Sequence, residues 1–323
     1  MCTAISWSAG AHYFGRNLDL HHHYQEAVTI TPRNFPFTFQ NGEYLDRHHA
    51  IIGIATVEDG YPLYYDAVNE MGLCVAGLNF PESAYYPPPA KEKKCLAPFE
   101  LIPFLLSSCA STRQAAALLS SHTLCHMPFS THFPVTPLHW LLCDEAECVA
   151  VEATREGLKI LEDPVGVLTN EPPLPYHLLR MRELMQLTCR APENRLAPPL
   201  DLKPFSLGMG GIGLPGDLSS PSRFQRAAFT RLQSVQPSDN LAAVGQFFHI
   251  LESVSQTDGC TAVGEGFEKT VYSCCCDTKN MTYYYTTYEN RQPTGVHLYH
   301  EDLERQVLVQ YPLSFHPHIR MEN

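Results

Sequence analysis

The stretch that decides the fold is residues 2–19, CTAISWSAGAHYFGRNLD. Its two halves alternate apolar or β-branched residues with small and polar ones, and Ala9-Gly10-Ala11 separates them. This pattern predicts strands over Thr3–Ser8 and His12–Gly15. Because the connection is short, the second strand is expected to pair back on the first and to bring Arg16 and Asp19 close to the start of the chain.

Working outward, similar short segments fill the first 80 residues and return near the end of the chain. Further strands are predicted over Ala27–Thr31, Ile51–Thr56, Leu63–Val68, Leu73–Leu78, Leu138–Leu142, Cys148–Glu152, Leu158–Leu161, Thr270–Cys276, Thr282–Tyr288 and Val296–Tyr299. Helical periodicity predicts helices over Pro98–Cys109, Ser111–Ser121, Tyr176–Leu187, Pro221–Val235 and Asn240–Val254. The fourth helix is expected to begin with Ser220 as its N-cap.

The order of these elements predicts the fold class. Strands, then helices, then more strands, with few βαβ alternations, indicate an α+β protein with layered antiparallel sheets. No internal repeat or low-complexity linker divides the 323 residues, so we expect a single domain over residues 2–323.

Charge and composition exclude several classes of protein. Lys+Arg minus Asp+Glu is 22 − 34 = −12, which argues against a nucleic-acid partner. No apolar run is long enough to span a membrane, and the start MCTAISW has neither the basic n-region nor the apolar h-region of a signal peptide, so a cytoplasmic protein is expected. The 12 cysteines are scattered without a C-x-x-C pair, and most are predicted to be reduced thiols packed as small hydrophobic residues.

Two patterns that suggest a cofactor or a metal have simpler interpretations. Gly208, Gly210 and Gly213 match G-x-G-x-x-G, but the next residues, LPGD, disfavour the helix that dinucleotide binding requires, so a surface loop is expected. His21-His22-His23 is interpreted as a solvated loop, because adjacent residues of a strand point in opposite directions. Neither a cofactor nor a metal is therefore predicted.

The candidate nucleophile is Cys2. The elbow G-x-S-x-G of serine hydrolases is absent, whereas removal of Met1 would leave Cys2 as the first residue with a free α-amine. One residue could then supply both the nucleophile and the general base. Arg16 would favour the thiolate of Cys2, and Asp19 could hold the α-amine.

Longer motifs carry a family resemblance. They are FGRNLD at 14–19, NEMGL at 69–73 continuing to AGLNFP at 76–81, TPLHW at 136–140, GVLTN at 166–170, LPGDLSSPSRF at 214–224 and CTAVGEGF at 260–267. Together with Cys2, in this order, they resemble the choloylglycine hydrolase family, which includes bile salt hydrolases and penicillin V acylases. The resemblance extends from residue 2 to about residue 290. It implies an N-terminal nucleophile hydrolase with an αββα sandwich, usually a homotetramer, that cleaves an amide bond without a cofactor.

The resemblance also assigns residues to roles. The implied catalytic set is Cys2, Arg16, Asp19, Asn79, Asn170 and Arg223. In this set Cys2 attacks the amide carbonyl, and Asn79 and Asn170 donate to the oxyanion. Asp19 and Arg223 orient the amine, while Arg16 holds the thiolate.

The resemblance favours conjugated bile salts as the small-molecule substrate, because bile salt hydrolases carry Asn at the position of Asn79, where several penicillin V acylases carry Tyr. Residues expected to line an apolar pocket are Leu18, Leu20, Tyr24, Tyr65, Phe129, Phe133 and Leu138. A penicillin V acylase and an enzyme that transfers the acyl group to amines remain alternatives. A non-catalytic binding protein is disfavoured, since Cys2 and both predicted oxyanion donors are present.

Overall fold

Two antiparallel sheets form the centre of the protein in the computed structural model, which describes residues 1–323. The first sheet has six strands in the order β14-β1-β2-β17-β18-β19. Their bounds are β1 Cys2–Ser8, β2 His12–Leu20, β14 Val167–Leu168, β17 Lys269–Asp277, β18 Thr282–Thr287 and β19 Thr294–His297. As the sequence predicts, β2 pairs back on β1, and this pairing places Leu18 opposite Cys2.

The second sheet has eight strands in the order β13-β12-β11-β8-β7-β6-β3-β20. Their bounds are β3 Ala27–Thr31, β6 Ile51–Glu58, β7 Tyr61–Asn69, β8 Cys74–Asn79, β11 Leu138–Cys143, β12 Cys148–Thr154, β13 Gly157–Glu162 and β20 Val309–Pro312. The remaining strands are short pairs: β4 Phe37–Thr38 with β5 Tyr44–Leu45, β9 Cys95–Leu96 with β10 Thr123–Leu124, and β15 Ala262–Val263 with β16 Gly266–Phe267.

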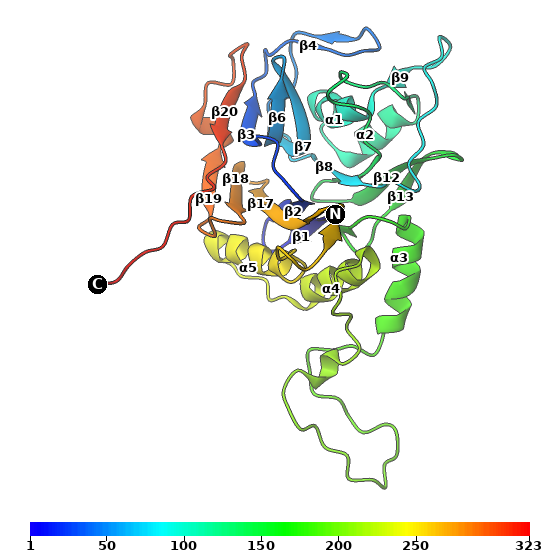
Figure 1. Ribbon diagram of the computed structural model, residues 1–323, viewed down its shortest axis with the longest axis vertical. Coiled ribbons are helices and arrows are strands. Elements are labelled where there is room, and N and C mark those ends of the chain that lie inside the picture. Colours follow the sequence, from blue (N-terminus) through cyan, green and yellow to red (C-terminus); the bar gives the residue numbers. More distant parts are fainter.

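Helices cover the outer faces of both sheets (Figure 1). On the first sheet lie α4 Ser220–Gln233 and α5 Asn240–Glu252, and on the second lie α1 Leu101–Ser108 and α2 Thr112–Leu119. A fifth helix, α3 Leu174–Arg180, packs beside α4. Short 3-10 helices span Pro98–Glu100, Met181–Leu184, Met209–Gly211 and Leu298–His300. The predicted α+β class and the αββα sandwich are confirmed. None of the helices has the length and apolar character needed to cross a membrane.

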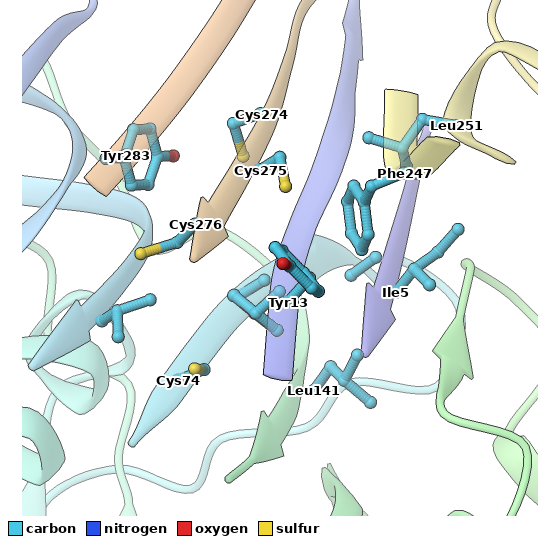
Figure 2. Close-up of a cluster of buried hydrophobic side chains, with 14 of the residues drawn as sticks. Ile5, Tyr13, Cys74, Leu141, Phe247, Leu251, Cys274, Cys275, Cys276 and Tyr283 are labelled. Carbon is cyan, nitrogen blue, oxygen red and sulfur yellow. The ribbon is translucent and has the colours of Figure 1, made fainter. Parts of the chain in front are cut away.

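The main core lies between the sheets and under α4 and α5, and it is rich in sulfur (Figure 2). Cys274, Cys275 and Cys276 follow one another along β17 and are fully buried. Because strand side chains alternate, Cys275 faces α5 while its neighbours face the second sheet. Ten cysteines are free, as the sequence analysis expects for most of them, but Cys95 and Cys125 form a disulfide that it did not predict.

Two predicted helix boundaries were wrong, the end of α3 and the start of α4. Helix α3 ends at Arg180 and continues as 3-10 helix to Leu184, short of the predicted Leu187. Ser220 is the first residue of α4, and Ser219 is the N-cap. The Ser220 hydroxyl accepts a hydrogen bond from the Asn170 N–H at 2.8 Å. Its side chain therefore contacts the loop after β14 and does not cap α4.

A buried histidine in the first sheet predicts a pH dependence of stability. His12 is 2% exposed, its Nε2 lies 2.9 Å from Ser6 Oγ, and burial lowers its pKa to about 4. Below the ordinary pKa of 6.5 the unfolded chain therefore binds a proton that the folded chain does not. The free energy of unfolding should fall by about 1.4 kcal/mol per pH unit as the pH falls through this window, from this residue alone.

Urea unfolding of the wild type and of His12→Gln at several pH values between neutrality and pH 4 would measure this contribution. The variant is expected to lose stability less steeply as the pH falls. Equal slopes for the two proteins would contradict the assignment to His12.

Candidate active site

Cys2 is the first residue of β1, and its side chain is almost fully buried. Since successive strand side chains point to opposite faces, Cys2 points between the two sheets and Thr3 points toward the helices. The contact of Thr3 Oγ1 with Arg223 of α4, at 2.7 Å, agrees with this direction. The predicted nucleophile therefore projects from a strand that neighbouring strands hold on both sides.

Two side chains clamp the main chain of Cys2. Asn170 Oδ1 accepts a hydrogen bond from the Cys2 N–H at 2.8 Å. Arg223 donates from Nη1 to the Cys2 carbonyl at 2.5 Å and from Nη2 to Asn170 Oδ1 at 2.7 Å. Arg223 lies in the first turn of α4 and is 1% exposed. Burial lowers the pKa of this guanidinium, and Asp19 opposes that effect.

Asp19, near the end of β2, holds the residue that precedes β1. Its backbone N–H donates to the Met1 carbonyl at 3.0 Å, and the Met1 ammonium donates to the Asp19 carbonyl at 2.8 Å. A register shift between Thr270 and Tyr272 of β17 accompanies the pairing of Thr270 with Asp19. The Thr270 hydroxyl donates to Asp19 Oδ1 at 2.7 Å, whereas Oδ2 is buried without a partner.

The electrostatics of Asp19 favour a cationic partner. Burial raises the pKa of its carboxyl, and Arg223 and the N-terminal ammonium lower it. A buried acceptor with no donor costs about 1–3 kcal/mol. The unpartnered Oδ2 of Asp19 is therefore suited to accept a hydrogen bond from an ammonium group placed close to it.

Arg16 points the other way, into the second sheet. Its Nη1 donates to the Gly77 carbonyl at 2.5 Å and to the Tyr65 carbonyl at 3.1 Å. Burial alone would lower the pKa of this guanidinium, but the neighbouring Cys2, Tyr272 and Asp66 raise it. Cys2 therefore lies within electrostatic reach of a buried cation, as the sequence analysis expects.

Sequence reasoning missed a buried acidic residue that lies within electrostatic reach of Arg16. Asp66 of β7 is fully buried and accepts hydrogen bonds from the Tyr272 hydroxyl, at 2.6 Å, and from the Tyr283 hydroxyl. Burial raises the pKa of the Asp66 carboxyl, and Arg16 lowers it. One signal was present: Asp66 interrupts the apolar residues of a predicted strand.

Asn79 ends β8, with an exposed side chain. Its main-chain carbonyl accepts a hydrogen bond from Asn170 Nδ2 at 2.8 Å. The two predicted oxyanion donors are thus adjacent, and one of the two N–H groups of the Asn170 amide is already in use. In all, the structure brings Cys2, Asp19, Asn79, Asn170 and Arg223 into one neighbourhood, and Arg16 lies within electrostatic reach of Cys2.

The predicted pocket residues fall into two groups. Leu18 and Leu20 lie on β2, while Tyr24 and Tyr65 meet at the Thr56 hydroxyl, which donates to the Tyr24 carbonyl at 3.0 Å and lies 2.9 Å from the Tyr65 hydroxyl. The second group contains Phe129 and Phe133, whose ring centroids are 6.2 Å apart, and Leu138, which pairs with Asn79. Leu18 is buried, Tyr24 is 42% exposed and the other five are half-buried.

Two cavities lie away from these residues. One, of about 530 Å³, lies between α5 and β17–β18, and the other, of about 490 Å³, lies beside the turn between β11 and β12. Neither is lined by a predicted pocket residue. No group of three or more His, Cys, Asp or Glu side chains is arranged to hold a metal ion.

Comparisons with known proteins identify the family of this chain. The profile of the linear amide C–N hydrolases, choloylglycine hydrolase family, matches residues 2–311. A bile salt hydrolase/transferase of Lactiplantibacillus plantarum is 48% identical over 314 residues, which cover 97% of each chain. A bile salt hydrolase/transferase of Clostridium perfringens is 33% identical over 318 residues, covering 96% of each chain.

Solved structures extend the comparison. A crystal structure of a mutant of conjugated bile acid hydrolase from Clostridium perfringens matches with a TM-score of 0.92 and 30% identity, over 100% of both chains. Penicillin V acylase from Agrobacterium tumefaciens matches with a TM-score of 0.76 over 96% of this chain and 90% of that one. At 18% identity the second likeness concerns the fold alone.

The stacked sheets between helix layers, with a cysteine at the start of a central strand, place the protein among the hydrolases of the N-terminal nucleophile fold. Within that class the chain belongs to the choloylglycine hydrolase family, and it is a linear amide C–N hydrolase.

Proposed function

We propose that this protein hydrolyses the amide bond of glycine- or taurine-conjugated bile salts and releases free bile acid and the amino acid. The observation that carries the proposal is the 48% identity, over 97% of each chain, to a protein named bile salt hydrolase/transferase. Asn at position 79, the residue that bile salt hydrolases carry there, adds support.

Removal of Met1 precedes catalysis, because it converts the backbone N–H of Cys2 into an α-amine. The Cys2 sulfur attacks the amide carbonyl carbon, and its proton passes to the α-amine. That ammonium is held by Asn170 Oδ1, which already accepts from the Cys2 nitrogen, and by the free Asp19 Oδ2. It then protonates the leaving nitrogen, so that the C–N bond breaks and a thioester remains.

The tetrahedral oxyanion needs fixed donors. The Asn79 side-chain amide and the second N–H of Asn170 supply them, and each donor is worth about 2.7–4 kcal/mol by analogy with other oxyanion sites. Water attacks the thioester, and the acid leaves with regeneration of the thiol. Arg223 fixes the main chain of Cys2, and the cationic Arg16 is positioned to stabilise negative charge that develops on the attacking sulfur.

The acyl group is bound between the two groups of predicted pocket residues. Leu18 and Tyr65 belong to the first group, and Phe129, Phe133 and Leu138 form the second. Apolar and aromatic side chains of this kind suit a rigid steroid, which has few polar groups to satisfy.

Amine release from glycocholate, taurocholate and penicillin V, measured side by side, tests the proposal. Purified protein with an intact mass that lacks Met1 is compared with Cys2→Ser. We expect rapid release of glycine or taurine by the wild type and at least about a 10³-fold lower rate for the variant, because the nucleophile has changed. Turnover of penicillin V alone would reassign the enzyme as a penicillin V acylase.

A second candidate function is transfer of the acyl group to an amine. Two relatives carry the name hydrolase/transferase, and a thioester can react with an amine as well as with water. Mass spectrometry of the products formed with an added amino acid distinguishes the two, since only transfer yields a new conjugate.

We further propose that the protein assembles as a homotetramer through the long segment between α3 and α4, which projects away from the sheets (Figure 1). Its exposed apolar side chains include Met185, Leu196, Leu200, Phe205, Leu207 and Ile212. Several large apolar side chains exposed along one projecting segment favour an interaction surface. Light scattering is expected to give a tetramer for the wild type and smaller species for Phe205→Ser with Leu207→Ser. A wild-type monomer would contradict the proposal.

A further inference from the structure

The segment that carries Asn170 leaves the first sheet after Leu168, the last residue of β14. Beyond that point its main-chain polar groups have no strand to pair with, and buried groups of this kind need other partners. Three side chains from three separate elements supply them. Ser220 of α4 accepts from the Asn170 N–H, and two histidines hold the neighbouring carbonyls.

The first histidine is His139 of β11, which is fully buried. Its Nε2 lies 2.9 Å from the Thr169 carbonyl oxygen, and because a carbonyl can only accept, Nε2 carries the proton. Its Nδ1 lies 3.5 Å from Glu152 Oε1, an oxygen that accepts a hydrogen bond from the Leu174 N–H at the start of α3. The ring stacks on Phe80, with centroids 4.2 Å apart and planes 6° apart.

The second histidine, His177 of α3, makes the same two kinds of contact as His139. It is fully buried, and its Nε2 donates to the Asn170 carbonyl at 3.0 Å. Its ring stacks on Phe224, the residue after Arg223, with centroids 4.8 Å apart. Burial lowers the pKa of His177 to about 4, so the ring is neutral near neutral pH with its proton on Nε2.

We propose that His139 and His177 are positioning residues for the amide hydrolysis, because their Nε2–H groups hold the carbonyls of Thr169 and Asn170 and thereby fix the Asn170 amide against Cys2. The inference rests on the proposed role of Asn170 in the reaction. Both rings are locked by stacking, so a rigid pair of donors sets the main chain from which Asn170 reaches Cys2, Asn79 and Arg223. Neither histidine touches the Cys2 main chain itself.

Paired substitutions test the hydrogen bonds separately from the packing. His177→Leu removes the donor at similar volume, whereas His177→Gln keeps a side-chain N–H that can reach the same carbonyl. With glycocholate we expect kcat of His177→Leu to fall about 100-fold, the size of effect caused by a misplaced catalytic group, while KM changes little. His177→Gln should recover most of the loss. The same pair at His139 repeats the test from the other carbonyl.

His122 provides the matched control. It is also buried, its Nδ1 lies 2.9 Å from the Leu118 carbonyl and its ring packs on Phe104, but it belongs to the helix layer on the far side of the second sheet. His122→Leu should lower thermal stability and leave kcat unchanged. A folded His177→Leu enzyme with wild-type kcat, or a His177→Gln enzyme as impaired as His177→Leu, would overturn the proposal.

A crystal structure of each His177 and His139 variant gives a readout that does not depend on the substrate. We expect Asn170 Oδ1 to move away from the Cys2 nitrogen in the Leu variants and to keep the 2.8 Å contact in the Gln variants. An unmoved Asn170 in the Leu variants would refute the positioning role. An inactive wild type with a displaced Asn170 in these variants would instead refute the proposed function alone.

Discussion

Protein that retains a residue before Cys2 should hydrolyse conjugated bile salts about 10²–10⁴-fold more slowly than protein that begins at Cys2, which is the range for loss of a general base. With Met1 present, the Cys2 nitrogen is a peptide N–H that donates to Asn170 Oδ1 and cannot take a proton from the thiol. The Met1 ammonium cannot replace it, because it is held by Glu268 Oε2 at 2.6 Å and by the Asp19 carbonyl.

One preparation can supply both forms. The chain is expressed with a short extension that a protease removes directly before Cys2, and activity is followed as cleavage proceeds, with intact mass as the measure of processing. Activity should rise in proportion to the fraction that begins at Cys2. Labelling with iodoacetamide shows whether the thiol is accessible in both forms. Full activity before cleavage would contradict the α-amine mechanism and leave the thiol to act with another base.

Much of the fold could be predicted because hydrophobic periodicity is local. Strand β3 matches its predicted range, and β6, β7 and β8 differ from theirs by no more than two residues at either end. Strand β14 has only two residues, too few to show a period, so Val167–Leu168 could not be identified as the edge of the first sheet. The disulfide between Cys95 and Cys125 depends on the approach of β9 and β10, which no spacing in the sequence reveals.

The candidate site divides in the same way. The hairpin of β1 and β2 brings Arg16 and Asp19 to Cys2, and that follows from local pattern alone. Asn79, Asn170 and Arg223 come from distant elements, and only the family resemblance identified them. Neither the local pattern nor the family resemblance identified Asp66, His139 or His177 as important. Their roles depend on hydrogen bonds made between the two sheets and with the loop after β14.

Replacing Asp66 by leucine should lower the free energy of unfolding by about 2–6 kcal/mol, because two buried hydroxyls lose their acceptor at about 1–3 kcal/mol each. Asp66 and Arg16 are both fully buried, and the hydroxyls of Tyr272 and Tyr283 both donate to the Asp66 carboxylate. Without Asp66 the guanidinium keeps its carbonyl contacts to Gly77 and Tyr65 but loses its buried countercharge, and two hydroxyls lose their acceptor. Urea unfolding of the wild type and Asp66→Leu measures the effect.

The double variant Arg16→Leu with Asp66→Leu identifies the source of this cost. If the Arg16 charge left without a nearby negative charge dominates, removing Arg16 as well should restore part of the loss, because no charged group then remains buried at these two positions. Tyr283→Phe should cost about 1.5–3 kcal/mol, the value of one hydrogen bond to a charged group.

The exposed Asp201, paired with Lys203 at 2.9 Å, serves as the control, and Asp201→Leu should change stability by less than about 1 kcal/mol. A double variant that is less stable than Asp66→Leu by the full cost of Arg16→Leu would show that Arg16 and Asp66 act independently.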